Sequence, residues 1–85
     1  MEVEKIQAGK SMRDIVKEEL RHIPRGNEAQ NELRMFYWPL RMNSLGKKAS
    51  APDKTKEDIL IEAINAVQNT HKGFVPKYNK DFFKA

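Results

Sequence analysis

TKEDILIEAINAVQNTH, residues 55–71, has the strongest helical pattern in the chain. Thr55 followed three residues later by Asp58 is a capping box, in which each side chain bonds the other residue's backbone N–H at a helix start. Apolar residues then share one broad face, because they recur at helical spacing; they are Ile59, Leu60, Ile61, Ala63, Ile64 and Val67. Gly73 supplies the left-handed residue that commonly follows a helix. The pattern predicts a helix over residues 55–71.

A second helix is predicted upstream, beginning at the cap pattern of Ser11 and Asp14. Its apolar face consists of Met12, Ile15, Val16, Leu20 and Ile23. Pro24 is expected to end this helix, because the residue before a proline avoids the helical region.

Another helix is predicted between these two, where Asn27 and Gln30 repeat the capping pattern. Its apolar stripe consists of Leu33, Phe36, Tyr37 and Leu40. Pro39 has no amide hydrogen and its ring clashes with the carbonyl four residues earlier, so we expect this helix to stop or kink sharply near Trp38.

Residues 43–54, NSLGKKASAPDK, are rich in Gly, Ser, Pro and Lys, and they are expected to form a flexible basic loop. The whole chain of 85 residues has the size of one small domain, 1–85. We therefore expect a mostly α fold of three helices with this long basic loop between the second and third. The alternative is an α+β fold with a short strand pair from the two termini, the second strand confined to an edge by Pro76.

Composition narrows the classes of function. Sixteen Lys and Arg against twelve Asp and Glu give a net charge of +4, which favours a polyanionic partner. The chain has no cysteine, so it contains neither a disulfide nor a thiolate metal site. No apolar stretch approaches the ~18 to 20 residues that span a bilayer, and residues 1–4 do not resemble a signal peptide. A cytoplasmic protein with no membrane partner is the expectation.

Positive charge is concentrated in residues 33–52, which contain no acidic residue. At helical spacing Arg34, Trp38 and Arg41 form an exposed ridge, with an indole between two guanidiniums. Guanidiniums contact phosphates, and an indole stacks on an unpaired base for about 1 to 3 kcal/mol. The predicted nucleic-acid-binding residues are therefore Arg34, Trp38, Arg41, Lys47 and Lys48, with Arg25 and the C-terminal lysines as secondary positions. The ordinary alternative is that Trp38 packs in the core and the arginines are solvated.

Apolar and aromatic residues outside that segment suggest a protein partner or a homo-oligomer. The apolar face of residues 55–71 is wider than a thin domain covers, which makes Ile59 and Ile61 candidate partner-binding residues. Tyr78, in a C-terminal run that alternates bases with aromatics, is the third. We expect at least one of Phe82 and Phe83 to fold back into the core.

Other motifs predict no chemistry. Gly9-Lys10-Ser11 resembles the end of a phosphate-binding loop, but Glu4 stands where that loop needs its first glycine. Two histidines, His22 and His71, without clustered acids are too few ligands for a zinc site. We expect no enzymatic activity, no metal and no cofactor.

The sequence therefore favours a small non-enzymatic protein that binds nucleic acid, preferably RNA or another single strand. The alternative is a protein-binding inhibitor or adaptor of the kind that phages and mobile elements encode. Such a protein acts on a host enzyme, for example a nuclease together with its RNA.

Overall fold

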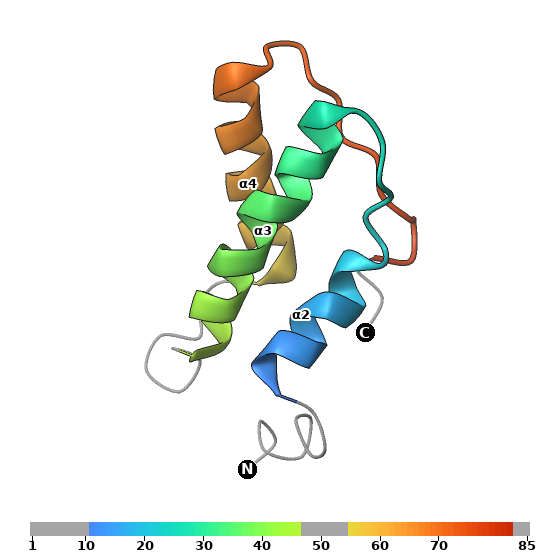
Figure 1. Cartoon of the computed structure of the whole chain (residues 1–85). Coiled ribbons are helices and arrows are strands. Elements are labelled where there is room, and N and C mark those ends of the chain that lie inside the picture. The colour runs from blue at the N-terminus through green and yellow to red at the C-terminus, as the bar shows by residue number, and fades with distance from the viewer. Residues whose placement is uncertain (1–10, 47–54, 83–85) are drawn as a thin grey trace.

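The computed structural model describes residues 11–46 and 55–82, which form three helices and no strand (Figure 1). The helices are α2 (Met12–Leu20), α3 (Glu28–Gly46) and α4 (Lys56–Thr70). α3 is the longest and packs against both other helices. The expected mostly α fold of three helices is confirmed. Of the alternative strand pair, the N-terminal half lies outside the described residues, and residues 73–78 form no strand.

Polar caps begin each helix at the residue that the sequence predicts. Ser11, Asn27 and Thr55 accept hydrogen bonds from the backbone N–H three residues later, at 3.2, 2.9 and 3.2 Å. Asp58 completes the predicted box by accepting from the Thr55 N–H at 3.3 Å. Gly73, after α4, adopts the predicted left-handed conformation with φ of 84°. These starts depend on local chemistry alone, because each cap satisfies backbone donors that the helix leaves free.

α2 ends a little earlier than expected. The helix stops at Leu20, and the Ile23 N–H then bonds the Leu20 carbonyl at 3.0 Å in a tighter turn. Pro24 follows this turn, so, contrary to the sequence prediction, the proline does not itself end the helix.

α3 continues through Pro39 to Gly46, so of the stop or sharp kink predicted near Trp38, the stop is wrong. Residues 43–46, expected to begin the loop, are the last turn of this helix, and residues 47–54 lie outside the described residues. The reason is burial on both sides of the proline. Tyr37 before it and Leu45 after it are both core residues, and burying two such side chains offsets the roughly 3 kcal/mol that an interior proline costs.

The core lies between the three helices and residues 74–82, which we call the C-terminal segment. Its buried apolar residues are Val16, Leu20, Ile23, Ala29, Leu33, Tyr37, Leu45, Ile59, Leu60, Ala63, Val67, Phe74 and Phe82. The rings of Phe82 and Tyr37 meet edge to face with centroids 5.7 Å apart. Phe82 thus confirms the expectation that a C-terminal phenylalanine packs in the core; Phe83 lies outside the described residues.

Gln30 of α3 holds the C-terminal segment in place. Its side-chain nitrogen donates to the Lys77 carbonyl, and its side-chain oxygen accepts from the Lys77 N–H at 3.1 Å. The Asn79 N–H donates to the His22 carbonyl at 2.7 Å. Figure 1 shows this segment, in red, running back from α4 past the α2–α3 loop. One buried amide therefore replaces the backbone partner that a neighbouring strand provides in a sheet.

Candidate functional site

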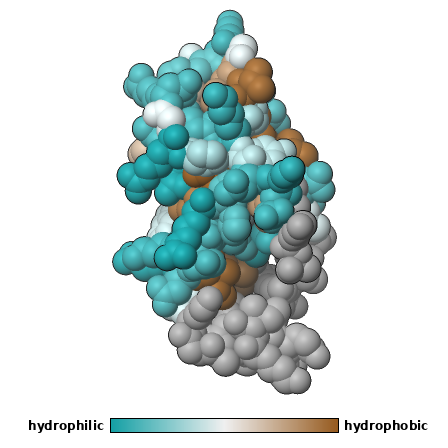
Figure 2. Space-filling view, turned by 90° about the vertical axis from the view of Figure 1, so that its right-hand side faces the viewer, coloured by the Kyte–Doolittle hydropathy of each residue, from teal (hydrophilic) through white to brown (hydrophobic). Residues whose placement is uncertain are grey.

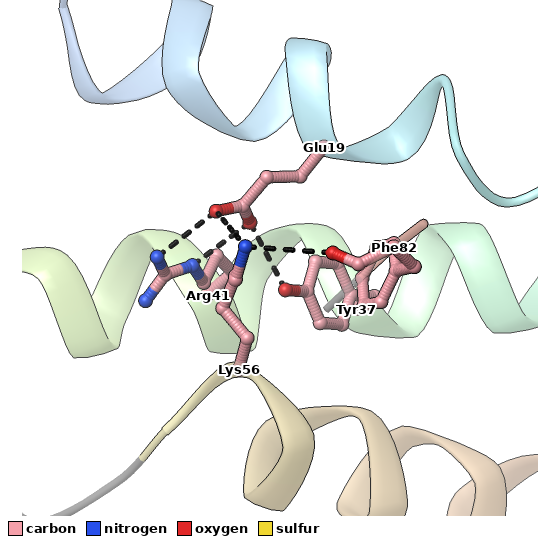
Figure 3. A network of polar contacts seen from close by, with 5 residues as sticks. All are labelled: Glu19, Tyr37, Arg41, Lys56 and Phe82. Atoms are coloured by element: carbon pink, nitrogen blue, oxygen red, sulfur yellow. Dashed lines mark hydrogen bonds and ion pairs between the residues drawn. The ribbon is translucent and has the colours of Figure 1, made fainter. Parts of the chain in front are cut away.

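Arg41 faces α2 instead of forming part of an exposed ridge (Figure 3). Its Nε donates to Glu19 Oε1 at 2.9 Å and its Nη2 donates to Glu19 Oε2 at 3.0 Å. The two side chains are only 14% and 12% exposed. Two of the three guanidinium nitrogens are thus committed to a carboxylate that neutralises the charge. This placement gives no support to the predicted phosphate contact of Arg41.

The same carboxylate has two more partners, and together the four residues form what we call the Glu19 network. The Tyr37 hydroxyl donates to Glu19 Oε1 at 3.0 Å, and Lys56 Nζ lies 3.9 Å from Oε2. Burial raises the pKa of the Tyr37 hydroxyl above its usual range, and the charge of Glu19 raises it further. Tyr37 therefore stays protonated and remains a donor. The network joins α2, α3 and α4 and explains Arg41 as a structural residue.

Arg34 has a different environment. Its Nη1 donates to two carbonyls: that of Leu20, the last residue of α2, and that of Ile23 in the turn that follows, the latter at 2.6 Å. Nε and Nη2 have no hydrogen-bond partner among the described residues. Burial lowers the pKa of Arg34 below its usual value, and the positive charge of Arg25 lowers it further. Arg34 is therefore fixed in position but keeps one edge of its guanidinium available.

Arg34 and Trp38 line an open groove beside the end of α2, which we call the arginine–tryptophan groove. Its volume is about 520 Å³, and its lining residues are Leu20, Arg25, Asn31, Arg34, Met35 and Trp38. Trp38 is partly buried and packs against the core. The Arg13 guanidinium lies over the indole, 5.8 Å from the ring centroid. In the described part of the chain, neither Arg25 nor Arg34 has an ion-pair partner.

The groove therefore combines two residues of the predicted site with Arg25, a secondary position in the sequence, and Arg13, which the sequence did not indicate, lies over its indole. Arg34 and Trp38 are brought together as expected, although the indole is half-buried and not fully exposed. Arg25, only a secondary position in the sequence, lines the same groove, and Arg13 comes from a different helix. No spacing rule links these segments, because only the packing of α2 on α3 brings them together. Lys47 and Lys48 lie outside the described residues.

The two partner-binding residues predicted on the apolar face of α4 differ in their exposure to solvent. Ile59 is 1% exposed and belongs to the core, so the prediction that it faces a partner is wrong: the side chain is covered by this chain itself. Ile61 is 50% exposed. Tyr78 is 40% exposed, and the centroid of its ring lies 5.9 Å from that of Phe82. Figure 2 shows mainly hydrophilic residues on the side of the molecule it presents, with hydrophobic areas that are separate from one another.

The described residues contain no group of three or more His, Cys, Asp or Glu side chains placed to hold a metal ion. His71, one of the two histidines considered as a metal ligand, bonds Glu32 through Nε2 at 3.1 Å and so links the end of α4 to α3. In the same ranges, no helix has the length and apolar character needed to span a membrane.

Comparison with protein-family models, with curated proteins and with solved structures gives no match for this chain.

Proposed function

We propose that this protein binds single-stranded nucleic acid, with RNA favoured, through the arginine–tryptophan groove. The observation that carries the proposal is the presence of two guanidiniums, Arg25 and Arg34, beside Trp38 with no carboxylate paired to them in the described residues. Two like charges in one groove repel each other, as the effect of Arg25 on the pKa of Arg34 reflects. A bound anion relieves that repulsion.

The residue types suit a phosphate backbone with unpaired bases. A guanidinium offers paired N–H groups that match two phosphate oxygens, and an indole offers a flat apolar surface to a base. The chain's net charge of +4 adds a long-range attraction for a polyanion. A single strand is favoured over a duplex, because the bases of a duplex are stacked on each other and cannot enter a groove.

The sole tryptophan of the chain provides the test, because Trp38 lines the groove and its fluorescence reports on what enters it. A single-stranded RNA is titrated into the protein at several salt concentrations. We expect a change in fluorescence and an affinity that falls by about 0.7 log units per log unit of salt for each phosphate contacted.

Arg25→Ala is expected to weaken binding and to reduce the salt slope by about 0.7, the share of one phosphate. Arg21→Ala is the matched control: it removes the same charge from an exposed side chain that pairs with Glu18 and does not line the groove. Equal affinities and equal slopes for the two variants would contradict the proposal.

A second candidate function is docking onto a protein, as an adaptor or inhibitor. It is favoured by Met35, which lines the groove and is 69% exposed, and by the exposed Ile61 on α4. An apolar interface changes little with salt, whereas phosphate contacts weaken steeply. Binding to a protein that is unaffected by salt and abolished by Met35→Glu, with no binding to RNA, would favour this second function.

A further inference from the structure

We infer that the arginine–tryptophan groove accepts one unpaired nucleotide at a time, its phosphate between Arg25 and Arg34 and its base against Trp38 and Met35. This inference rests on the proposed function and specifies the unit that is recognised. It requires that phosphate-binding and base-binding groups lie within the span of a single nucleotide, and that the phosphate-binding groups are held in position before the ligand arrives.

The spacing of residues along α3 meets the first requirement. Met35 and Trp38 are three positions apart on one helix, so their side chains are neighbours on its surface. Arg34 lies four positions before Trp38, just over one turn or ~6 Å along the helix axis at ~1.5 Å per residue. All three line the same groove. A phosphate and a base joined by one sugar are separated by a comparable distance.

The bonds of Arg34 meet the second requirement. Its Nη1 is anchored to the carbonyls of Leu20 and Ile23 at the end of α2, so the guanidinium plane has a fixed orientation. The Nε and Nη2 hydrogens on the other edge can donate to two oxygens of one phosphate. Because the side chain is already ordered, binding costs less conformational entropy there than at a freely rotating arginine. Arg25, which is exposed and unpaired among the described residues, supplies the second cation.

The size of the groove agrees with a single nucleotide. Its volume of about 520 Å³ lies within the ~300 to 1,000 Å³ of ordinary small-molecule sites. The walls are apolar at Leu20, Met35 and Trp38, and the charges are the guanidiniums described above. An aromatic base with one phosphate matches this division into an apolar part and an anionic part.

The experiment compares ligands that contain one or both parts of a nucleotide. Adenosine 5′-monophosphate, adenosine and ribose 5-phosphate are each titrated against the full chain, with Trp38 fluorescence as the signal. A single-stranded RNA of eight adenosines and an abasic strand of equal length complete the set. We expect the monophosphate to bind at least about tenfold more tightly than adenosine or ribose 5-phosphate, and the abasic strand to bind at least about tenfold more weakly than the RNA.

Variants test which residue binds the phosphate of the nucleotide and which binds its base. Arg25→Ala should weaken the monophosphate several-fold and leave adenosine unchanged, whereas Met35→Ala should weaken adenosine and leave ribose 5-phosphate unchanged. Arg21→Ala, outside the groove, should change neither. Both Arg25 and Met35 are exposed, so these variants are expected to fold; helical circular dichroism checks this.

The outcomes separate the inference from the proposed function. If the abasic strand binds as tightly as the RNA, the base plays no part: the inference is wrong and nucleic-acid binding stands. If the monophosphate binds but neither strand does, the groove is a nucleotide site and the proposed function is wrong. If no phosphorylated ligand changes the fluorescence or binds by calorimetry, both are overturned.

Discussion

The Glu19 carboxylate and the Arg41 guanidinium form an ion pair with two hydrogen bonds, 2.9 and 3.0 Å long, across the contact between α2 and α3. Because Glu19 also accepts from Tyr37 and lies near Lys56, it is the common partner of the network. Glu19→Ala is therefore expected to lower the free energy of unfolding by about 3 kcal/mol, and Arg41→Ala by about 2 kcal/mol.

Urea denaturation at neutral pH measures these differences. Glu18→Ala is the matched control, since Glu18 forms an exposed pair with Arg21 and its removal should cost less than about 1 kcal/mol. A Glu19→Ala variant no less stable than Glu18→Ala would show that the network does not support the packing of α2.

The raised pKa of Tyr37 is expected to make the protein less stable at alkaline pH. Burial, followed by the charge of Glu19, raises the pKa of its hydroxyl in the folded protein, whereas the unfolded chain releases this proton at pH about 10. Above that pH the folded state binds one more proton than the unfolded state, so the free energy of unfolding decreases as pH rises. The contribution is complete below pH about 10 and is lost at about 1.4 kcal/mol per pH unit above it.

Tyr37→Phe removes this dependence, although it costs about 1 kcal/mol at neutral pH through the lost bond to Glu19. Chemical denaturation of both proteins at pH 8 and pH 11 measures the effect. Parallel decreases in stability for the two proteins would contradict the role given to Tyr37.

Replacement of Pro39 is expected to stabilise the protein. It lies inside α3 without an N–H to donate, so Pro39→Ala restores one helical hydrogen bond and removes the ring clash. The free energy of unfolding is expected to rise by about 1 to 3 kcal/mol, visible as a higher Tm. Pro24→Ala, outside the helices, is the control and should give no such gain. A lower Tm for Pro39→Ala would instead mean that the proline sets the path of α3 toward Glu19.

Substitution of Gln30 is expected to release the C-terminal segment locally. Gln30→Ala removes both bonds to the Lys77 backbone and is expected to cost about 2 kcal/mol. Hydrogen exchange of the Lys77 amide should become faster in the variant. Gln68→Ala is the matched control, because Gln68 is exposed and makes one bond to the Phe74 carbonyl, 3.1 Å long. Unchanged exchange at Lys77 would contradict the proposed role of Gln30.

The beginnings of the helices could be predicted because caps such as Thr55 act on backbone groups within one turn. The end of α3 could not, because it depends on tertiary packing. The local cost of Pro39 is offset by the burial of Tyr37 and Leu45, and burial is a property of the assembled fold.

The same distinction between local pattern and tertiary packing applies to the candidate site. Arg34 and Arg41 look equivalent in the sequence, and what distinguishes them is the partner that each meets after folding. Glu19, 22 positions away, neutralises Arg41, whereas Arg34 bonds two carbonyls, lies near Arg25 and has no carboxylate partner among the described residues. Spacing on one helix predicts which residues share a face, but not which carboxylate from another helix lies opposite them.

The position of Phe82 in the core has a consequence for biosynthesis. A nascent chain that already contains all three helices still lacks the ring that packs against Tyr37. Until the ribosome has passed Phe82, that part of the interior stays open to water and to chaperones. We therefore expect any fragment truncated before Phe82 to be a substrate for proteolytic quality control.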